Sequence, residues 1–170
     1  MTTYTPSIAS DVLLLNWYYD MATCDDFESV FSAELAPCSA FMASMRGCNL
    51  IYESDEKGIW FAAWFGRMMC AGIYGVWIRA DKRNQPGGGA ALAAGLESLA
   101  FGLETFPVLL FVTKQPEVLQ LSKRFGFVSL GEMPWVFDGD PASAAWLDAA
   151  HFRQANPRVV FTALTDSLNG

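Results

Sequence analysis

The sequence predicts a mixed α/β domain built on a largely antiparallel β-sheet. Between residues 49 and 78, three runs rich in aromatic and β-branched residues are separated by short polar turns, which is typical of an antiparallel meander. A glycine-rich turn at 84–90 then leads into a leucine-patterned stretch and an apolar run, which is the order of a β-α-β crossover. A chain of 170 residues is also long enough to bury the core of one domain.

Apolar residues at helical spacing predict helix from Asp26 to Met45. Asp25, followed three residues later by Glu28, resembles a helix start. Pro37 lacks a backbone N–H and should split the region into two short helices. The residues that recur at spacings of three and four are Phe27, Val30, Phe31 and Leu35.

The strand-like runs of the meander are NLIYES, IWFAAWF and MCAGIYGVWI, with the turns DEKG and GRM between them. The third run contains Gly72 and Gly75, and glycine inside a strand often marks a bulge or the close approach of another backbone or a ligand. The aromatic residues of these runs are expected in the core, and an aromatic wall for a cation is the alternative. They are Trp60, Phe61, Trp64, Phe65 and Trp77.

The crossover helix is predicted after the glycines, because leucines step by four, three and four there and would share one face. PVLLFV at 107–112 is wholly apolar, as expected of a strand covered on both faces. The leucines are Leu92, Leu96, Leu99 and Leu103.

The next segment, PEVLQLSKRFG, has the ends of a compact helix, with Pro116 in the first turn and Gly126 at the left-handed stop. FVSL and MPWVF are expected to be closing strands. Residues 141–154 are expected to form a helix, and RVVFTAL is expected to be a last strand.

The acidic residues are concentrated near the N-terminus. Residues 1–57 hold nine Asp and Glu against two Lys and Arg (2 − 9 = −7), whereas residues 58–170 hold nine of each. Phosphate binding needs a basic face, so this balance argues against nucleic acid as a partner. It would suit a cationic small molecule or a basic peptide, and a solvated acidic surface is the alternative.

The composition also indicates where the protein is located and whether it binds a metal. No apolar run reaches the ~18 residues of a membrane span, and the first residues lack the pattern of a signal peptide. No cysteines are spaced as C-x-x-C and His151 is the only histidine, so no zinc or other metal is expected. Cys24, Cys38, Cys48 and Cys70 are expected to be small buried apolar residues, as in a reducing cytoplasm.

The glycine-rich turn is a candidate anion site, because a helix N-terminus offers unpaired N–H groups and a partial positive charge. Arg79, Lys82 and Arg83 precede the turn and could neutralise phosphates. The P-loop and dinucleotide spacings are both absent. A tight turn without a ligand is the alternative reading.

The order of these features over about residues 50–130 resembles the GNAT N-acyltransferase superfamily. Members bind acetyl-CoA with a Q/R-x-x-G-x-G/A turn, which fits here in two registers, and Arg83 is the equivalent of the first position if the loop carries one extra residue. LSKRFGF resembles the family's leucine-tyrosine-x-x-x-glycine-phenylalanine ending. The two registers are Gln85, Gly88, Ala90 and Asn84, Gly87, Gly89.

The resemblance implies a mixed sheet of about six or seven strands with helices on both faces. It also implies a single domain over residues 1–170, in which 138–170 is a C-terminal extension. Acetyl-CoA would be the acyl donor, with its pyrophosphate on the glycine turn and its pantetheine arm between the fourth and fifth strands. The arm would run beside Val76, Trp77 and Ile78, and Gln115 falls where relatives often bind it.

The catalytic residues are less clearly indicated by the resemblance. The family's usual acid is a tyrosine, but Ser122 stands at that position, and Tyr74 is an alternative hydroxyl. The third strand run has no acidic residue to act as base. Glu53 is the candidate taken from a set that could face the acceptor, and a surface role is the alternative for each member. The set is Asp20, Asp26, Glu34 and Glu53.

The resemblance therefore implies an N-acyltransferase that acts on the amine of a small cationic molecule or peptide. A second hypothesis is a catalytically degenerate GNAT-fold binding or assembly protein, because the tyrosine is missing. The 52% hydrophobic content is compatible with a buried interface such as that of a homodimer.

Overall fold

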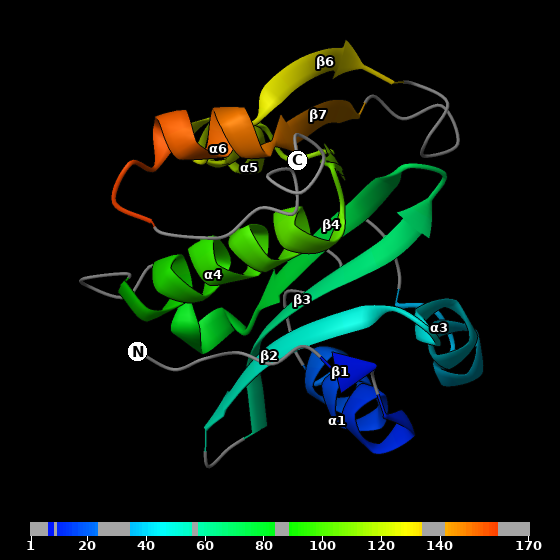
Figure 1. The fold of residues 1–170 in the computed structure, drawn as a ribbon. Coiled ribbons are helices and arrows are strands. Elements are labelled where there is room, and N and C mark those ends of the chain that lie inside the picture. The colour runs from blue at the N-terminus through cyan, green and yellow to red at the C-terminus, as the bar shows by residue number, and fades with distance from the viewer. Residues whose placement is uncertain are drawn as a thin grey trace. The chain divides into compact units, whose positions relative to one another are not determined.

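The computed structural model describes residues 7–8, 10–23, 35–55, 58–83, 89–133 and 142–159. Their strands form one sheet in the order β1-β2-β3-β4-β5-β7-β6 (Figure 1). β4 and β5 are parallel, whereas β1–β2, β2–β3, β5–β7 and β6–β7 are antiparallel. The predicted mixed, mostly antiparallel fold class is confirmed. The elements are β1 (Ser7–Ile8), α1 (Asp11–Ala22), α3 (Cys38–Met45), β2 (Asn49–Asp55), β3 (Gly58–Met68), β4 (Ala71–Ile78), the 3-10 turn η1 (Ala80–Lys82), α4 (Gly89–Thr105), β5 (Val108–Thr113), α5 (Pro116–Arg124), β6 (Val128–Glu132), β7 (Ser143–Asp148) and α6 (Ala149–Ala155).

The chain divides into two compact units. Unit 1 comprises Met1–Gly66 and Gly75–Ser98, and unit 2 comprises Arg67–Tyr74 and Leu99–Gly170. Unit 1 holds the N-terminal helices and β1–β3, and unit 2 holds β5–β7 with α5 and α6. The single domain over 1–170 stays a prediction.

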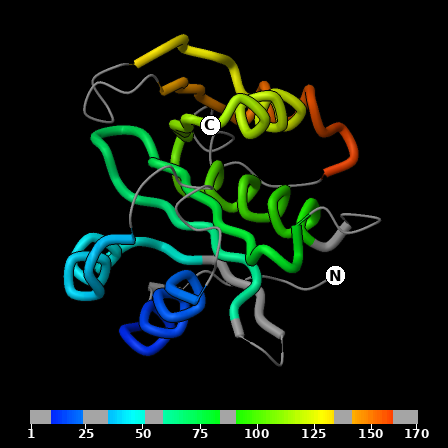
Figure 2. Tube along the Cα trace, turned by 180° about the vertical axis from the view of Figure 1, so that it is seen from behind, coloured from blue at the N-terminus to red at the C-terminus, as the bar shows by residue number. Residues whose placement is uncertain are grey.

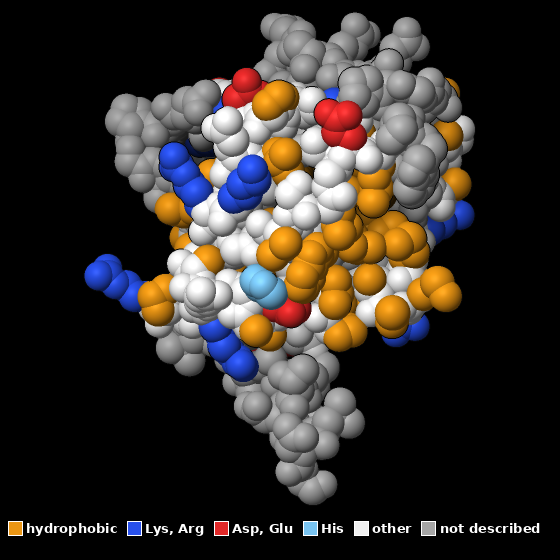
Figure 3. Space-filling model, turned by 90° about the horizontal axis from the view of Figure 1, so that it is seen from above, with side chains coloured by type: hydrophobic (Ala, Val, Ile, Leu, Met, Phe, Trp, Pro, Cys, Tyr) orange, Lys and Arg blue, Asp and Glu red, His pale blue; other side chains and the backbone are white. Residues whose placement is uncertain are grey.

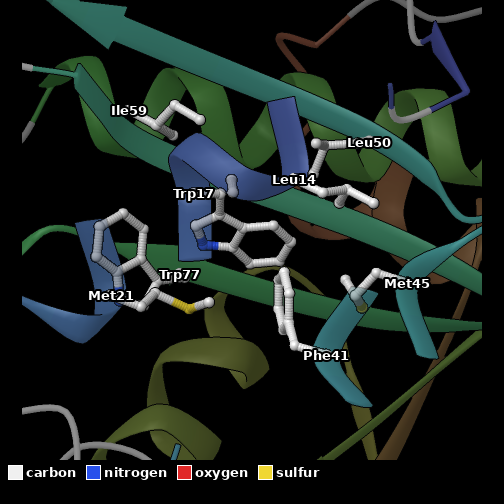
Figure 4. Close-up of a cluster of buried hydrophobic side chains, with 9 residues drawn as sticks. Leu14, Trp17, Met21, Phe41, Met45, Leu50, Ile59 and Trp77 are labelled. Carbon is white, nitrogen blue, oxygen red and sulfur yellow. The ribbon is translucent and has the colours of Figure 1, made fainter. Parts of the chain in front are cut away.

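The core of unit 1 lies between α1, α3 and the β2–β4 strands. Figure 2 shows α1 and α3 beside β2, and Figure 4 shows the Trp17 indole at the centre of the cluster. Trp17 meets the Phe41 ring edge-on at 5.3 Å. α1 was not predicted, although Ser10 caps it and Leu14, Trp17 and Met21 recur on one buried face. Of the helix predicted from Asp26, the part after Pro37 is α3, and residues 24–34 lie outside the described residues.

The predicted meander is confirmed with one corrected turn. β3 continues to Met68, and the turn is Met69–Cys70 rather than GRM, with Met69 at φ 50°. Cys70 is exposed there, so the expectation that all four cysteines are buried is wrong. Opposite β2, Trp60 forms a bulge because Ser54 pairs with Ile59 and Glu53 with Phe61.

Burial on both sides of β3 shows that both faces of this part of the sheet are covered. Ala62 packs in the α1–α3 core, whereas Phe61, Ala63 and Phe65 point the other way and are also buried. Gly75 on β4 is needed beside Trp64, because a Cβ at that position would overlap the indole ring. The glycine thus makes room for a neighbouring side chain in unit 1.

The β4–α4–β5 crossover is confirmed, but the buried face of α4 is not the predicted leucine stripe. Leu99 and Leu103 are buried, whereas Leu92 is 48% exposed. Small residues, Ala94 and Ser98, take the buried places in the earlier turns. The leucine spacing predicted the helix correctly, but it indicated the wrong residues for the buried face of the first turns.

In unit 2, α5 has its predicted bounds, with Pro116 at its start and Gly126 at φ 100° after its end. The helix predicted over 141–154 is wrong, because β7 occupies Ser143–Asp148 and only the following residues turn into α6. The prediction that β5 is covered on both faces is wrong in part, since Leu109 and Phe111 are buried and its other face is only half-buried. Most of MPWVF and RVVFTAL lies outside the described residues.

Candidate functional site

The glycine turn leads directly into a long helix. Asn84, Gln85, Gly87 and Gly88 lie outside the described residues, and α4 begins at Gly89 and Ala90. The first N–H groups of an α-helix have no partner within the helix, and the aligned peptide dipoles add a partial positive charge there. This end of α4 therefore has the electrostatics of an anion site.

The basic residues before the turn are held by the chain itself. Arg79 donates two hydrogen bonds to the Asp81 carboxylate, at 2.6 and 3.1 Å, so much of its charge is balanced locally. Arg83 donates from Nε to the Ile78 carbonyl at 2.6 Å, which fixes its guanidinium at the end of β4. Both arginines are thus held near the end of β4, Arg79 by a carboxylate and Arg83 by a backbone carbonyl.

The end of β4 lies beyond the residues that pair with β5. The β4–β5 ladder consists of the pairs Gly72–Leu109 and Ile73–Leu110, although β4 continues to Ile78. The Trp77 side chain is buried in the α1–α3 core, whereas Val76 and Ile78 are half-buried.

The hydroxyl at the position of the family tyrosine is already engaged. Ser122 is 5% exposed, and its Oγ donates to the Leu119 carbonyl at 2.8 Å, within its own helix. Gln115 stands at the start of α5, where its backbone N–H donates to Thr113 Oγ1 at 3.1 Å. Its side chain makes no capping hydrogen bond to that helix.

Tyr74, on β4, lies near the LSKRFGF segment that ends α5. Its ring stacks on Phe127 with centroids 6.5 Å apart, and Phe127 in turn contacts Phe111. The Phe127 N–H donates to the Ser122 carbonyl at 3.2 Å. Tyr74 and Ser122 are thus both neighbours of the phenylalanine that ends the LSKRFGF segment.

The acidic candidates are only partly described. The Glu53 backbone pairs with Phe61 in the β2–β3 ladder, but its side chain is outside the described part of the structure. Asp20 is half-buried on α1. Asp26 and Glu34 lie outside the described residues.

A pair of titratable side chains that the sequence did not single out lies where β7 turns into α6. His151 Nδ1 is 2.8 Å from Asp148 Oδ1, and the same oxygen accepts the His151 backbone N–H at 2.9 Å. The Trp146 ring meets the imidazole edge-on at 4.9 Å. Burial works to raise the pKa of Asp148, but the hydrogen bonds from the backbone and ring of His151 outweigh it and hold that pKa below its ordinary value.

The described residues contain neither a membrane-spanning helix nor a cluster of metal-binding side chains. No described helix is long and apolar enough to cross a membrane. Within the same residues, no three His, Cys, Asp or Glu side chains gather closely enough to hold a metal ion.

Comparison with known proteins places the fold. No protein-family model matches the chain, and no curated protein matches it in sequence. Among solved structures, spermidine N-acetyltransferase from Vibrio cholerae, in complex with CoA and spermine, is 11% identical with a TM-score of 0.66. The match covers 88% of this chain and 97% of that one.

Two further solved structures agree with the first. The ribosomal-protein-S18-alanine N-acetyltransferase of Escherichia coli is 15% identical with a TM-score of 0.61, over 86% of this chain and 94% of that one. An acetyltransferase of the GNAT family from Desulfovibrio desulfuricans is 12% identical with a TM-score of 0.56, over 86% and 98%. The chain has the fold of the GNAT N-acetyltransferase superfamily.

Proposed function

We propose that the protein is an acyl-CoA-dependent N-acyltransferase, with acetyl-CoA as the donor and the amine of a small cationic molecule or peptide as the acceptor. The observation that carries the proposal is the order of β4, a 3-10 turn flanked by Arg79 and Arg83, the glycines and the N-terminus of α4. Solved structures of the same fold include one with acetyl-CoA and one with CoA and spermine.

In this proposal the donor is held by backbone and by one arginine. The N–H groups at the start of α4, with the glycines from Gly87 to Gly89, take the pyrophosphate because glycine lets phosphate oxygens approach the main chain. Arg83, which precedes the glycines in the sequence and is held at the Ile78 carbonyl, supplies a positive charge. The β4 backbone from Val76 to Ile78, and Gln115, bind the pantetheine arm.

The chemistry is attack of a neutral amine on the thioester carbonyl. It needs a group that removes a proton from the ammonium and one that protonates the departing sulfur. Tyr74 and Ser122 are the candidates for the second role, and the Ser122 hydroxyl donates to the Leu119 carbonyl. A thiol is also a fair leaving group, with a pKa of about 8.5, so this acid is helpful rather than essential.

A cationic acceptor is supported by charge. The excess of acidic residues before residue 58 would attract an ammonium ion and repel nucleic acid. The neighbour from Vibrio cholerae is named for a polyamine, which is the same class of molecule.

The proposal is tested by titrating the protein with CoA and acetyl-CoA in a calorimeter. We expect micromolar binding that is weakened at least tenfold in Arg83→Ala and much less in Arg79→Ala, which serves as the matched control. Gly87→Val with Gly88→Val should abolish binding, because the added side chains would keep phosphate oxygens away from the main chain. Absence of binding to the wild-type protein at high micromolar CoA would refute the proposal.

Turnover is the second half of the test. Release of free thiol from acetyl-CoA is followed with spermine, a lysine-rich peptide and simple alkylamines as acceptors. Binding of CoA without turnover of any amine would instead support the catalytically degenerate binding protein, which the engaged Ser122 hydroxyl favours.

A further inference from the structure

Two buried indole N–H groups in the core of unit 1 have no hydrogen-bond acceptor among the residues that the structure describes. They are Trp17 Nε1 on α1 and Trp77 Nε1 on β4. Each side chain is only 1% exposed, so bulk water does not reach either nitrogen. The large majority of buried polar side-chain atoms in native proteins have a partner, and a buried donor without one is destabilising. Two such donors in one core therefore point to a partner from outside the described chain.

The two donors lie in one neighbourhood, which Trp64 connects. The centroids of the Trp64 and Trp17 rings are 5.0 Å apart. A Cβ on Gly75 would overlap the Trp64 indole, so that ring lies over Gly75 on β4. Gly75 and Trp77 are two residues apart on this strand and face the same side of the sheet. Figure 4 shows the Trp17 and Trp77 side chains in the same cluster, and the two N–H groups therefore belong to one candidate site.

The wall of this neighbourhood contains side chains that can adapt to a guest. Met21 and Met45 belong to the cluster, and Met42 packs against it from α3. Methionine is unbranched with three rotatable bonds, so it fills irregular gaps and tolerates rearrangement. Met21 follows Trp17 by four residues on α1, so the two side chains share one face of the helix. Rotation of these methionines can admit a small molecule without unfolding either helix.

The surroundings select an uncharged hydrogen-bond acceptor. An indole N–H can only donate, so its partner must present a lone pair. The described side chains of the cluster are hydrophobic, and those packed against it are uncharged. Burial raises the pKa of the Cys48 thiol, which packs against the cluster, so that group also stays neutral. An anion would be buried there without compensation, and the half-buried Asp20, three residues after Trp17, would repel it.

We propose that the core of unit 1 binds a small neutral molecule through an oxygen that accepts hydrogen bonds from Trp17 Nε1 and Trp77 Nε1. A carbonyl oxygen has two lone pairs and can accept from both donors. An enclosed water molecule offers the same chemistry, so the experiments below distinguish an organic ligand from water. The inference does not rest on the proposed acyl transfer.

The matched pair cyclopentanone and cyclopentane tests the site in the purified protein. The two molecules have nearly the same size, but only the ketone has an oxygen that accepts a hydrogen bond. A ligand that binds only the folded state raises the melting temperature. We expect cyclopentanone to raise it with concentration and to shift both indole N–H proton resonances downfield, and cyclopentane to do neither. Trp17→Phe and Trp77→Phe assign the two resonances.

Water as the source gives a different pattern. Both indole protons are then downfield before any ligand is added, with cross-relaxation to a long-lived water molecule, and cyclopentanone leaves them unchanged. That result supports a bound neutral oxygen and assigns it to water. Indole protons that show no water contact and do not respond to cyclopentanone would overturn the proposal. An equal effect of cyclopentane would also overturn it, because the site would then be only an apolar void.

Removal of one N–H at constant ring shape isolates the hydrogen bond. The amino acid β-(3-benzothienyl)alanine has the ring shape of tryptophan, with sulfur in place of the N–H. In place of Trp17 or Trp77 it should weaken cyclopentanone binding about fivefold, the scale of one neutral hydrogen bond. In the water case it should remove the water contact of the remaining indole. If neither replacement changes cyclopentanone binding or the water contact, the proposal is wrong.

Trp146 provides the matched control for this replacement. It lies on β7 in unit 2, is half-buried, and its indole N–H is not one of the buried donors without a partner. Figure 3 shows hydrophobic side chains gathered on the side of the molecule seen from above, where β6 and β7 lie in Figure 1. The same analogue at Trp146 should leave cyclopentanone binding unchanged. An equal loss there would overturn the proposal, because the effect would not be local to the two donors.

These outcomes are separate from those of the proposed function. CoA binding is measured by calorimetry and concerns the glycine turn before α4, whereas this site is followed through two indole resonances. Failure of the wild type to bind CoA would therefore leave the site standing. Failure of both cyclopentanone and water to contact the indoles would leave acyl transfer untouched.

Discussion

Replacing Gly126 by alanine should be among the most destabilising single-methyl changes in unit 2. The residue has φ 100°, where side chains are rarely accommodated, which costs about 1–3 kcal/mol. A Cβ there would also lie 2.6 Å from the His151 carbonyl oxygen and 2.9 Å from its carbon, both backbone atoms that cannot rotate away. Overpacking of this kind costs a further ~1–3 kcal/mol, so the total is about 2–6 kcal/mol.

Two other glycines provide the controls for this substitution. Gly131 has φ 90° but nothing within 4 Å of its Cβ position, so Gly131→Ala should cost only the backbone strain. Gly95 lies inside α4 with the same open space and an ordinary φ, so Gly95→Ala should stabilise by about 0.5–1 kcal/mol. The difference between Gly126→Ala and Gly131→Ala isolates the contact with α6.

The assay is urea unfolding followed by tryptophan fluorescence, with thermal melts alongside. For a chain of this length each kcal/mol shifts the melting temperature by about 2–4 °C, so Gly126→Ala should melt roughly 4–24 °C lower. Equal losses in Gly126→Ala and Gly131→Ala would refute the close approach of the α5 end to His151, and with it the placement of α6.

The remaining predictions concern caps, charge and one tryptophan. Asp148→Ala should cost about 0.5–2 kcal/mol by removing the α6 N-cap, whereas Asp148→Asn should keep most of the cap, as judged from urea midpoints. Because the folded pKa of Asp148 is lowered, its stabilisation is present above its ordinary pKa of 3.8 and is lost as pH falls through the folded value. The gap between wild type and Asp148→Asn should therefore close in acid, and a constant gap would contradict this. Gly75→Ala should destabilise by about 1–3 kcal/mol unless Trp64 is shortened to leucine in the same chain, which a double-mutant cycle measures. Ser10→Ala should cost about 1 kcal/mol through the lost cap of α1, and no change in the melting temperature would show that α1 does not limit unfolding.

The sequence predicted best those elements whose ends carry their own chemistry. α5 was predicted correctly because Pro116 and Gly126 act through backbone rules that hold in any context. β7 was missed because its alanines favour helix, and the preference was overridden by pairing with β5 on one side and β6 on the other. Ala144 and Ala145 are both buried there.

In the candidate site, too, local features could be predicted and long-range contacts could not. The glycine turn could be proposed as a donor site because glycines before a helix have a local physical meaning. The neighbours of Tyr74 could not be predicted, since Phe127 contacts it only through the fold. The Ser122 hydroxyl, a candidate acid on α5, donates to its own helix at the Leu119 carbonyl. That bond also forms locally, three residues apart, and a serine inside a helix makes it commonly.

His151 shows how a local signal can be overlooked when it is read for the wrong chemistry. A single histidine argues against a metal site, but it does not exclude other roles for the imidazole. Yet Asp148 and His151 are three positions apart, which is the spacing between a helix N-cap and the residue whose backbone N–H the cap accepts. When that third residue is histidine, the capping carboxylate can reach the ring as well as the backbone, which is what happens here. An Asp-x-x-His sequence at a strand–helix junction therefore predicts a histidine with its Nδ1 proton committed and its Nε2 free. Because the cap uses the backbone N–H and the pairing uses the ring, His151→Gln should abolish the ring pairing while leaving the cap intact.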